Sequence, residues 1–184
     1  MTQTTSKKTT GINAQTIALT AMFAALVTVT TAFIKIPAPL GYTHAGDSMI
    51  YLAACSLPGP FGFLAAAIGG ALADILSGYA HWAIPTAIIK SLNVLPFFIV
   101  RYALKNRAKK DAVITLPNLL MLIPTTLITL GGYFAANALM YDASAAFAEL
   151  LPNLIQAAVG AAGFIVIGLG LDAVGFKKKL LPRL

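Results

Sequence analysis

Charged side chains are scarce in this sequence, and cysteine is almost absent. Aspartate, glutamate, lysine and arginine make up 10% of the 184 residues, and 58% are hydrophobic, whereas soluble globular domains carry about 25% charged residues. Together with a mean hydropathy of +0.82, this excludes an ordinary soluble domain and predicts an integral membrane protein. The single cysteine, Cys55, excludes an internal disulfide and argues against a cysteine-based metal site.

The sequence also lacks the motifs of common active sites. It contains no GxxxxGK[ST], so we do not expect the chain itself to hydrolyse ATP, and it contains no HExxH, GxSxG or Cys/His cluster. The two histidines, His44 and His81, stand alone in expected loops. We therefore predict no catalytic residue, no metal site and no cofactor held by this chain.

The positive charge is confined to three short stretches. The formal net charge is +7, which could suggest nucleic acid, but the distribution indicates a membrane topology instead. Eleven of the 13 basic residues flank apolar runs: Lys7 and Lys8; Arg101, Lys105, Arg107, Lys109 and Lys110; Lys177, Lys178, Lys179 and Arg183. Because basic residues gather on the cytoplasmic side of membrane proteins, these stretches are predicted to be cytoplasmic, and no nucleic-acid partner is expected.

Apolar runs separated by proline and glycine predict an all-α bundle of six transmembrane helices in one domain, residues 1–184. The expected helices cover residues 13–34, 46–57, 61–77, 82–104, 115–140 and 149–175, between cytoplasmic tails 1–12 and 176–184. The second is short for a full crossing, so it is tilted, extended by neighbours or re-entrant. Loops are expected at 35–45, 78–81 and 142–148 on the outside. We expect no signal peptide and a multi-pass protein of a bacterial plasma membrane.

Polar side chains gather in the outer halves of the expected helices, while the inner halves are almost purely apolar. This pattern predicts a dead-end pocket that opens outward and binds a small polar aromatic compound. The candidate binding residues are Asp47, Asp74, Trp82, Thr86, Lys90, Tyr133, Asn137, Tyr141, Asn153 and Gln156. Other roles remain open, because Asp74 and Lys90 could form an internal ion pair, Trp82 could anchor the chain at the interface, and Asp47 could cap a helix.

A stripe of small residues follows the first expected helix. Ala14, Ala18, Ala21 and Ala25 fall on one face, and small residues let another helix approach closely. The stripe could pack inside this protein or dock a separate membrane subunit.

Residues 46–90 carry a long motif, GDSMIYLAA…PGPFGFLAAAIGGALADILSGYAHWAIPTAIIK. It resembles the substrate-binding (S) components of energy-coupling factor (ECF) vitamin transporters, and within them the hydroxymethylpyrimidine or pyridoxine branch. The step from Ala21 to Ala25 resembles that family's motif for docking on its coupling subunit. The match in detail covers about a quarter of the chain, whereas length and expected topology agree throughout.

The resemblance implies a vitamin-binding subunit without a transport cycle of its own. Its partners would be a transmembrane coupling protein and two cytoplasmic ATPases, which use the ATP, and it would topple in the bilayer to carry its ligand inward. The implied ligand is hydroxymethylpyrimidine or pyridoxine, with riboflavin or thiamine next. The competing interpretations are a self-sufficient small transporter, a membrane enzyme that uses Asp74 and Lys90, and a structural subunit that binds no small molecule.

Overall fold

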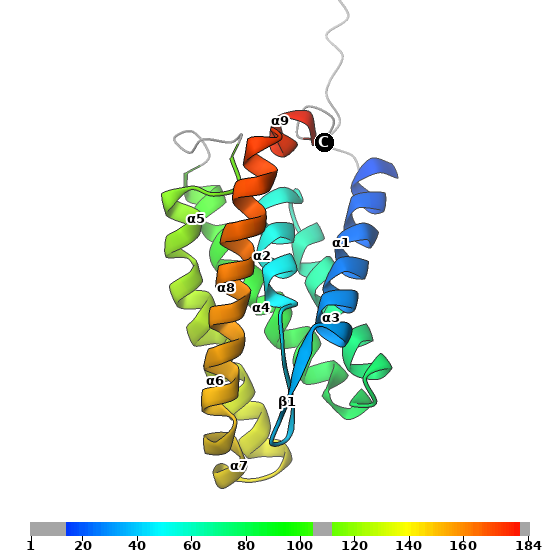
Figure 1. The fold of residues 1–184 in the computed structure, drawn as a ribbon, viewed down its shortest axis with the longest axis vertical. Helices are drawn as coiled ribbons and strands as arrows, with labels where there is room; N and C mark the ends of the chain where they lie inside the picture. The colour runs from blue at the N-terminus through cyan, green and yellow to red at the C-terminus, as the bar shows by residue number, and fades with distance from the viewer. Residues whose placement is uncertain (1–13, 105–111, 181–184) are drawn as a thin grey trace, which may run out of the picture.

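The computed structural model describes residues 14–104 and 112–180, which form a helical bundle with one small hairpin (Figure 1). The elements in chain order are α1 (Ala14–Phe33), β1 (Lys35–Ala38), β2 (Gly41–His44), α2 (Asp47–Ser56), α3 (Phe61–Leu76), η1 (Ala80–Trp82), α4 (Ala83–Ala103), α5 (Leu116–Leu120), α6 (Leu122–Met140), α7 (Ala143–Ala148), α8 (Leu150–Ala173) and α9 (Phe176–Leu180).

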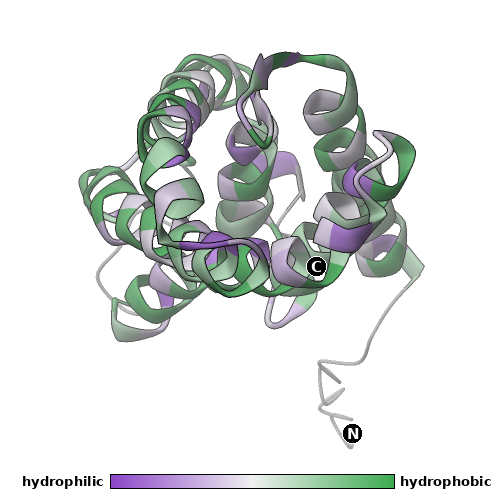
Figure 2. Cartoon of the chain, turned by 90° about the horizontal axis from the view of Figure 1, so that it is seen from below, coloured by the Kyte–Doolittle hydropathy of each residue, from purple (hydrophilic) through white to green (hydrophobic). Residues whose placement is uncertain are grey.

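Four helical stretches in the described part of the chain are long and apolar enough to cross a membrane. They are Ala14–Phe33, Ala80–Ala103, Leu116–Met140 and Ala143–Ala173, and α3 is a shorter apolar helix. Their outer faces carry large apolar side chains such as Ile84, Leu127 and Val166, each at least 65% exposed. Seen along the bundle from the hairpin end, apolar turns make up most of the ring (Figure 2). Exposed apolar side chains of this kind are expected where helices face lipid. The presence of six transmembrane helices remains a prediction.

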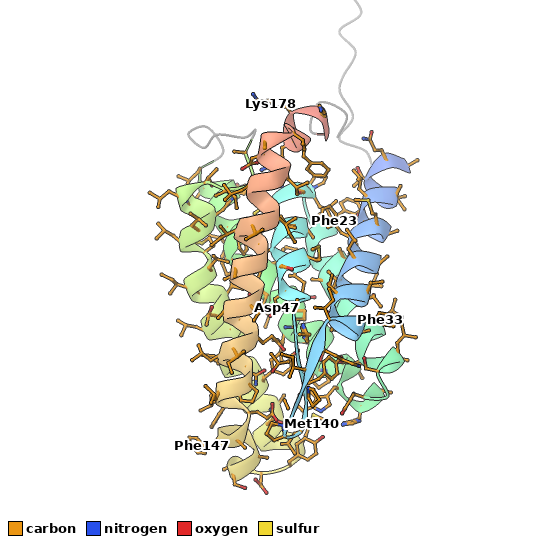
Figure 3. The ribbon with its side chains drawn as sticks, viewed as in Figure 1. Phe23, Phe33, Asp47, Met140, Phe147 and Lys178 are labelled. Carbon is orange, nitrogen blue, oxygen red and sulfur yellow. The ribbon has the colours of Figure 1, made fainter. Side chains whose placement is uncertain are left out.

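Helix α2 is the buried centre of the bundle. Nine of its ten residues are buried, and it contacts α1, α3, α4 and α8. Its shortness follows from its place, because it starts near the middle of the bundle's length, where Asp47 is labelled in Figure 3. Pro58 and Gly59, the latter with a φ of 50°, stand between its end and α3. The second expected helix is therefore surrounded by the others instead of facing lipid.

Two expected loops are ordered elements. Residues 35–44, predicted as a loop from their prolines, form an antiparallel hairpin in which Lys35 pairs with His44 and Ala38 with Gly41. Residues 143–148, also predicted as a loop, form α7. The Asp142 carboxylate caps this helix by accepting from the Ala145 amide at 2.8 Å, and the Ser144 hydroxyl and this amide lower the pKa of Asp142.

Proline separates neighbouring helices at two points of the chain. A proline lacks the N–H that would donate to the carbonyl four residues earlier. Pro124 thus leaves the carbonyl of Leu120 without its helical partner, and α5 ends there. Pro152 does the same to Ala148, where α7 ends. The expected helix 115–140 is consequently divided into α5 and α6. The expected helix 149–175 corresponds to α8, and α9 follows in the expected tail after Gly175, whose φ is 65°.

The described ends of the chain lie at one end of the bundle. The start of α1, the end of α4, the start of α5 and α9 are together, and the hairpin and α7 are at the opposite end (Figure 1). This arrangement agrees with an even number of passes. The basic loop 105–110 and the tail 1–12 lie outside the described residues, and the cytoplasmic side remains a prediction.

Candidate functional site

A pocket with an empty volume of about 440 Å³ opens between the hairpin and four helices. Figure 1 places these elements at the hairpin end of the bundle. Thirteen residues line the pocket: Leu40, Gly41, Tyr42, His44, Asp74, Tyr79, Trp82, Thr86, Tyr133, Asn137, Glu149, Asn153 and Gln156.

Aromatic rings form much of the wall. The ring centroid of Trp82 lies 5.8 Å from that of Tyr133 and 6.2 Å from that of Tyr141. On the hairpin side, the centroid of Tyr42 lies 5.3 Å from Tyr79 and 5.7 Å from His44. Rings at such spacings offer flat apolar faces on which a planar ligand can stack.

Three buried polar atoms of the wall have no hydrogen-bond partner among the described residues. They are Trp82 Nε1, Asp74 Oδ2 and Asn137 Oδ1, and each side chain is less than 9% exposed. The Thr86 hydroxyl faces the Asp74 carboxylate without reaching hydrogen-bond geometry. Because an unpaired buried polar group costs about 1–3 kcal/mol, these atoms mark places where a ligand would gain hydrogen bonds.

Beneath the pocket, Lys90 pairs with Asp47 and not with Asp74. Lys90 Nζ lies 2.5 Å from Asp47 Oδ1, and the two residues are 1% and 0% exposed. The alternative of an Asp74–Lys90 ion pair is therefore wrong, since Asp74 Oδ1 instead accepts from the Tyr42 hydroxyl at 2.6 Å. Gln156 Nε2 donates to the second oxygen of Asp47 at 3.2 Å.

Asp47 does not cap α2. Gly46 occupies the N-cap position and no side chain caps the helix. The Asp47 side chain turns toward α8 because Gly160 leaves room for it: a Cβ on Gly160 would lie 2.6 Å from the Cβ of Asp47. The capping alternative is thus wrong. The Asp47 carboxylate and Lys90 lie together beneath the pocket, and these two side chains form its polar floor.

Seven of the ten predicted binding residues line the pocket: Asp74, Trp82, Thr86, Tyr133, Asn137, Asn153 and Gln156. Asp47 and Lys90 lie underneath as the buried pair. Tyr141 lies at the rim, where its hydroxyl is 3.1 Å from His81 Nε2. The structure gathers the ten residues in or next to this pocket. Their role in binding remains a prediction.

Sequence reasoning missed the hairpin side of the pocket. The missed lining residues on this side belong to predicted loops: Leu40, Gly41, Tyr42 and His44 to 35–45, and Tyr79 to 78–81. The signal was present as an alternation, since Tyr42 and His44 stand two residues apart and so face the same way on a strand. Glu149, considered only as a helix boundary, accepts from the Leu40 amide at 2.7 Å and fixes the hairpin tip.

His44 is buried against the floor as a neutral ring. Burial, followed by the charge of Lys90, lowers the pKa of His44 from 6.5 to about 3. Its Nδ1 accepts from the Gly46 amide at 3.1 Å, which joins the hairpin to the start of α2. Within residues 14–104 and 112–180, no group of three or more histidine, cysteine or acidic side chains is arranged to hold a metal ion.

The alanine stripe of α1 faces outward. Ala14, Ala18, Ala21 and Ala25 are all exposed, and Thr16, Thr20, Phe23 and Val27 form the buried face of the same helix. On the inner face, Gly69 of α3 packs against Val27, and the Thr28 hydroxyl donates to the Gly69 carbonyl at 3.1 Å. The stripe therefore does not pack inside this protein, which leaves docking as its open interpretation.

Comparison with known proteins gives two matches. The family model described as "ECF-type riboflavin transporter, S component" matches residues 11–173. A protein of Pyrococcus woesei, named only as an uncharacterized protein in gap 3'region, is 33% identical over 160 residues, which cover 86% of this chain and 99% of that protein. The expectation of a bacterial membrane stays a prediction.

Proposed function

Since this chain belongs to the S-component family of ECF-type transporters, we propose that its pocket captures a flat, hydroxyl-bearing heterocyclic vitamin from outside the cell. Proteins of this family are transporter components and not enzymes, and they work with a coupling protein and ATPases. The proposal assigns capture of the ligand to this chain and the use of ATP to its partners.

The observation that carries the proposal is the combination of aromatic walls with unpaired buried polar atoms. Tyr133 and Trp82 offer stacking faces, and Asp74 and Asn137 offer unpaired oxygens. Of the described residues that line the pocket, none is a lysine or arginine. A phosphorylated ligand would lack a cationic partner here, so the pocket favours the unphosphorylated vitamin.

Two ligand classes follow from different observations. Riboflavin is the first compound to test, because the matched family is named for it. Hydroxymethylpyrimidine and pyridoxine come second, from the motif in residues 46–90. Thiamine is a further member of the test panel.

The exposed alanine stripe of α1 supports a docking surface for the coupling protein. An exposed face of small side chains permits close helix approach in lipid, and it lies on the side of α1 away from the bundle core. In this proposal the pocket binds the vitamin, and the stripe delivers the loaded subunit to the coupling complex.

Uptake of labelled vitamin into cells that supply the coupling complex tests the division of labour. Ala21→Trp with Ala25→Trp should leave binding to the purified chain unchanged and abolish uptake, because the bulky rings block docking. Tyr133→Ala should weaken binding and leave assembly intact. Ala135→Trp, at an exposed alanine of α6, is the matched control and should affect neither. Loss of binding in the α1 variant with normal uptake in Tyr133→Ala would contradict the proposal.

A further inference from the structure

Gln156 connects the pocket to the buried charge pair below it. Its side chain lines the pocket, and its Nε2 donates to Asp47 Oδ2 at 3.2 Å. Gln156 is 3% exposed, and Asp47 is fully buried. The amide is therefore held from below, at the boundary between the pocket and the floor.

The chemistry of the floor decides which end of this amide faces the ligand. A carboxylate only accepts hydrogen bonds, whereas an amide has a donating nitrogen and an accepting oxygen. Because Lys90 donates to Oδ1 of Asp47, Oδ2 remains the acceptor offered to Gln156. The Gln156 nitrogen must point at the floor, and none of the described residues donates to its oxygen.

Asn137 is oriented by the same logic. Its Nδ2 donates to the Tyr133 carbonyl at 2.9 Å, and a carbonyl can only accept. The Asn137 oxygen is thereby left buried without a partner, as is Asp74 Oδ2. Three residues of the wall thus present oxygen acceptors, and Trp82 Nε1 is an unpaired donor on the same wall.

Resting on the proposed function, we propose that Asp47 and Lys90 are positioning residues that turn the Gln156 oxygen into the pocket, so that Gln156, Asn137 and Asp74 together select a ligand edge rich in N–H and O–H donors. The indole N–H of Trp82 would donate a hydrogen bond to one acceptor on the ligand. The site would select by the number of donors on the ligand and not merely by its size.

The position of the charge pair argues for such a role. A buried ion pair is costly to desolvate, and apolar replacement is often neutral or stabilising, so packing alone gives little reason for it. Lys90 Nζ also lies 5.1 Å from the Tyr133 ring centroid, which links the pair to the aromatic wall. Gly160 gives Asp47 the space it needs one helical turn from Gln156.

Matched ligand pairs measure the preference directly. The probes are riboflavin with its analogue methylated on the ring N–H, pyridoxine with its analogue lacking the phenolic hydroxyl, and hydroxymethylpyrimidine with its analogue lacking the amino group. For the vitamin that the wild-type chain binds, the donor-bearing form should bind about tenfold or more tightly, the scale of one hydrogen bond to a buried partner.

Two variants then separate positioning from direct contact. The preference ratio is the affinity for the donor-bearing ligand divided by the affinity for its analogue. Gln156→Met removes the oriented oxygen and should reduce this ratio. The double variant Asp47→Asn with Lys90→Gln replaces the two buried charges with uncharged amides. These no longer dictate the orientation of the Gln156 amide, so the double variant should reduce the ratio to a similar degree. Combined with Gln156→Met, the double variant should produce no further change in the ratio, because both act through one group.

Asp172→Asn is the control for a purely structural loss. Asp172 lies in the last turn of α8 and accepts from the Val113 and Ile114 amides at 2.6 and 2.8 Å. The end of α8 next to α9 is opposite to the hairpin end of the bundle, where the pocket opens. This variant should lower thermal stability and leave the preference ratio unchanged. An equal change of the ratio in Asp172→Asn would overturn the positioning role.

Amide hydrogen exchange in the unaltered sequence decides the matter should the double variant fail to fold. The chain has three glutamines, Gln3, Gln15 and Gln156, so selective ¹⁵N labelling with Gln156→Met as the assignment control isolates one side-chain NH₂ signal. That signal should exchange slowly both before and after the vitamin is added, because it faces the floor. Protection that arises only with the vitamin would show the nitrogen in the pocket and overturn the proposal.

The remaining outcomes are distinct. Wild-type binding without a donor preference, or an unchanged ratio in the folded double variant, overturns the positioning role while the proposed function stands. Absence of binding to every vitamin of the panel overturns the proposed function, and the positioning role with it.

Discussion

At the residue scale, Trp82 offers the sharpest contrast between stability and binding. Its indole N–H is buried without a partner, and this unpaired donor lowers the stability of the empty protein. A bound ligand with an acceptor would supply the missing hydrogen bond. Trp82→Phe should therefore weaken vitamin binding about tenfold and leave the unfolding temperature of the empty protein unchanged or slightly higher. Ligand titration and thermal unfolding measure the two effects.

Tyr102→Phe is the matched aromatic control for that prediction. Tyr102 is 76% exposed near the end of α4, away from the pocket, and its variant should change neither quantity. Equal vitamin affinities in the Trp82→Phe and wild-type proteins would show that the indole N–H does not meet the ligand.

His44 predicts a pH dependence of stability. Its pKa is about 3 in the folded chain and 6.5 as an ordinary histidine, so between these values the unfolded state binds more protons. The free energy of unfolding should then be constant above pH 6.5 and fall toward pH 3, with a limiting slope of about 1.4 kcal/mol per pH unit. Denaturant unfolding in detergent across this range measures the slope.

The two histidines provide the comparison for this effect. His44→Asn should flatten the slope, because it removes the titrating group, and His81→Asn, at an exposed position, should not. A slope that survives unchanged in His44→Asn would assign the acid sensitivity to other groups.

At the residue scale, the sequence indicated which residues line the pocket where polar side chains shared one face of a helix. The spacing of Tyr133 and Asn137, and of Asn153 and Gln156, predicted a shared face for each pair, and all four residues line the pocket. The sequence suggested Asp74 as a possible partner of Lys90 and did not suggest Asp47, because the placement of the Asp47 side chain depends on the close approach of α2 and α8 at Gly160. Such an approach is not visible in the periodicity of either helix.

At the element scale, the close contact of α2 with α8 depends on the absence of a side chain. A methyl group on Gly160 would lie 2.6 Å from the Asp47 Cβ, so Gly160→Ala should force the helices apart and cost about 1–3 kcal/mol of unfolding free energy. It should also weaken vitamin binding, because the floor moves with α2. Chemical unfolding and ligand titration report the two effects.

Gly170 supplies the control on the same helix. A Cβ there meets nothing within 4 Å, so Gly170→Ala should leave stability unchanged or raise it by about 0.5–1 kcal/mol. A Gly160→Ala protein as stable as Gly170→Ala would disprove the tight contact.

The elements themselves were predictable in kind but not in detail. Apolar length correctly located the long helices, and Pro58 with Gly59 correctly ended the short one. The hairpin was missed because Pro37 and Pro39 suggest a loop, although prolines are tolerated in a two-stranded ribbon where ladder bonds alternate. The break at Met121 follows from Pro124, whose missing N–H leaves the carbonyl of Leu120 without its helical partner.

At the scale of the whole molecule, the bundle separates two surfaces. The pocket lies at the hairpin end and is closed from below by Asp47, Lys90 and the apolar core around Tyr51 and Phe164. The alanine stripe lies on the outer face of α1, apart from the pocket lining. This separation suits a subunit that binds its ligand alone and depends on partners for transport. The sequence could indicate both surfaces because each follows one helical face.

Native mass spectrometry of the detergent-purified chain, followed by titration with riboflavin, hydroxymethylpyrimidine, pyridoxine and thiamine, tests the central claim most directly. We expect a co-purified mass that matches one of these vitamins, and tight, ATP-independent binding of the same compound. Tyr133→Ala should weaken this binding. No bound mass and no binding across the panel would contradict the assignment of the pocket as a vitamin site.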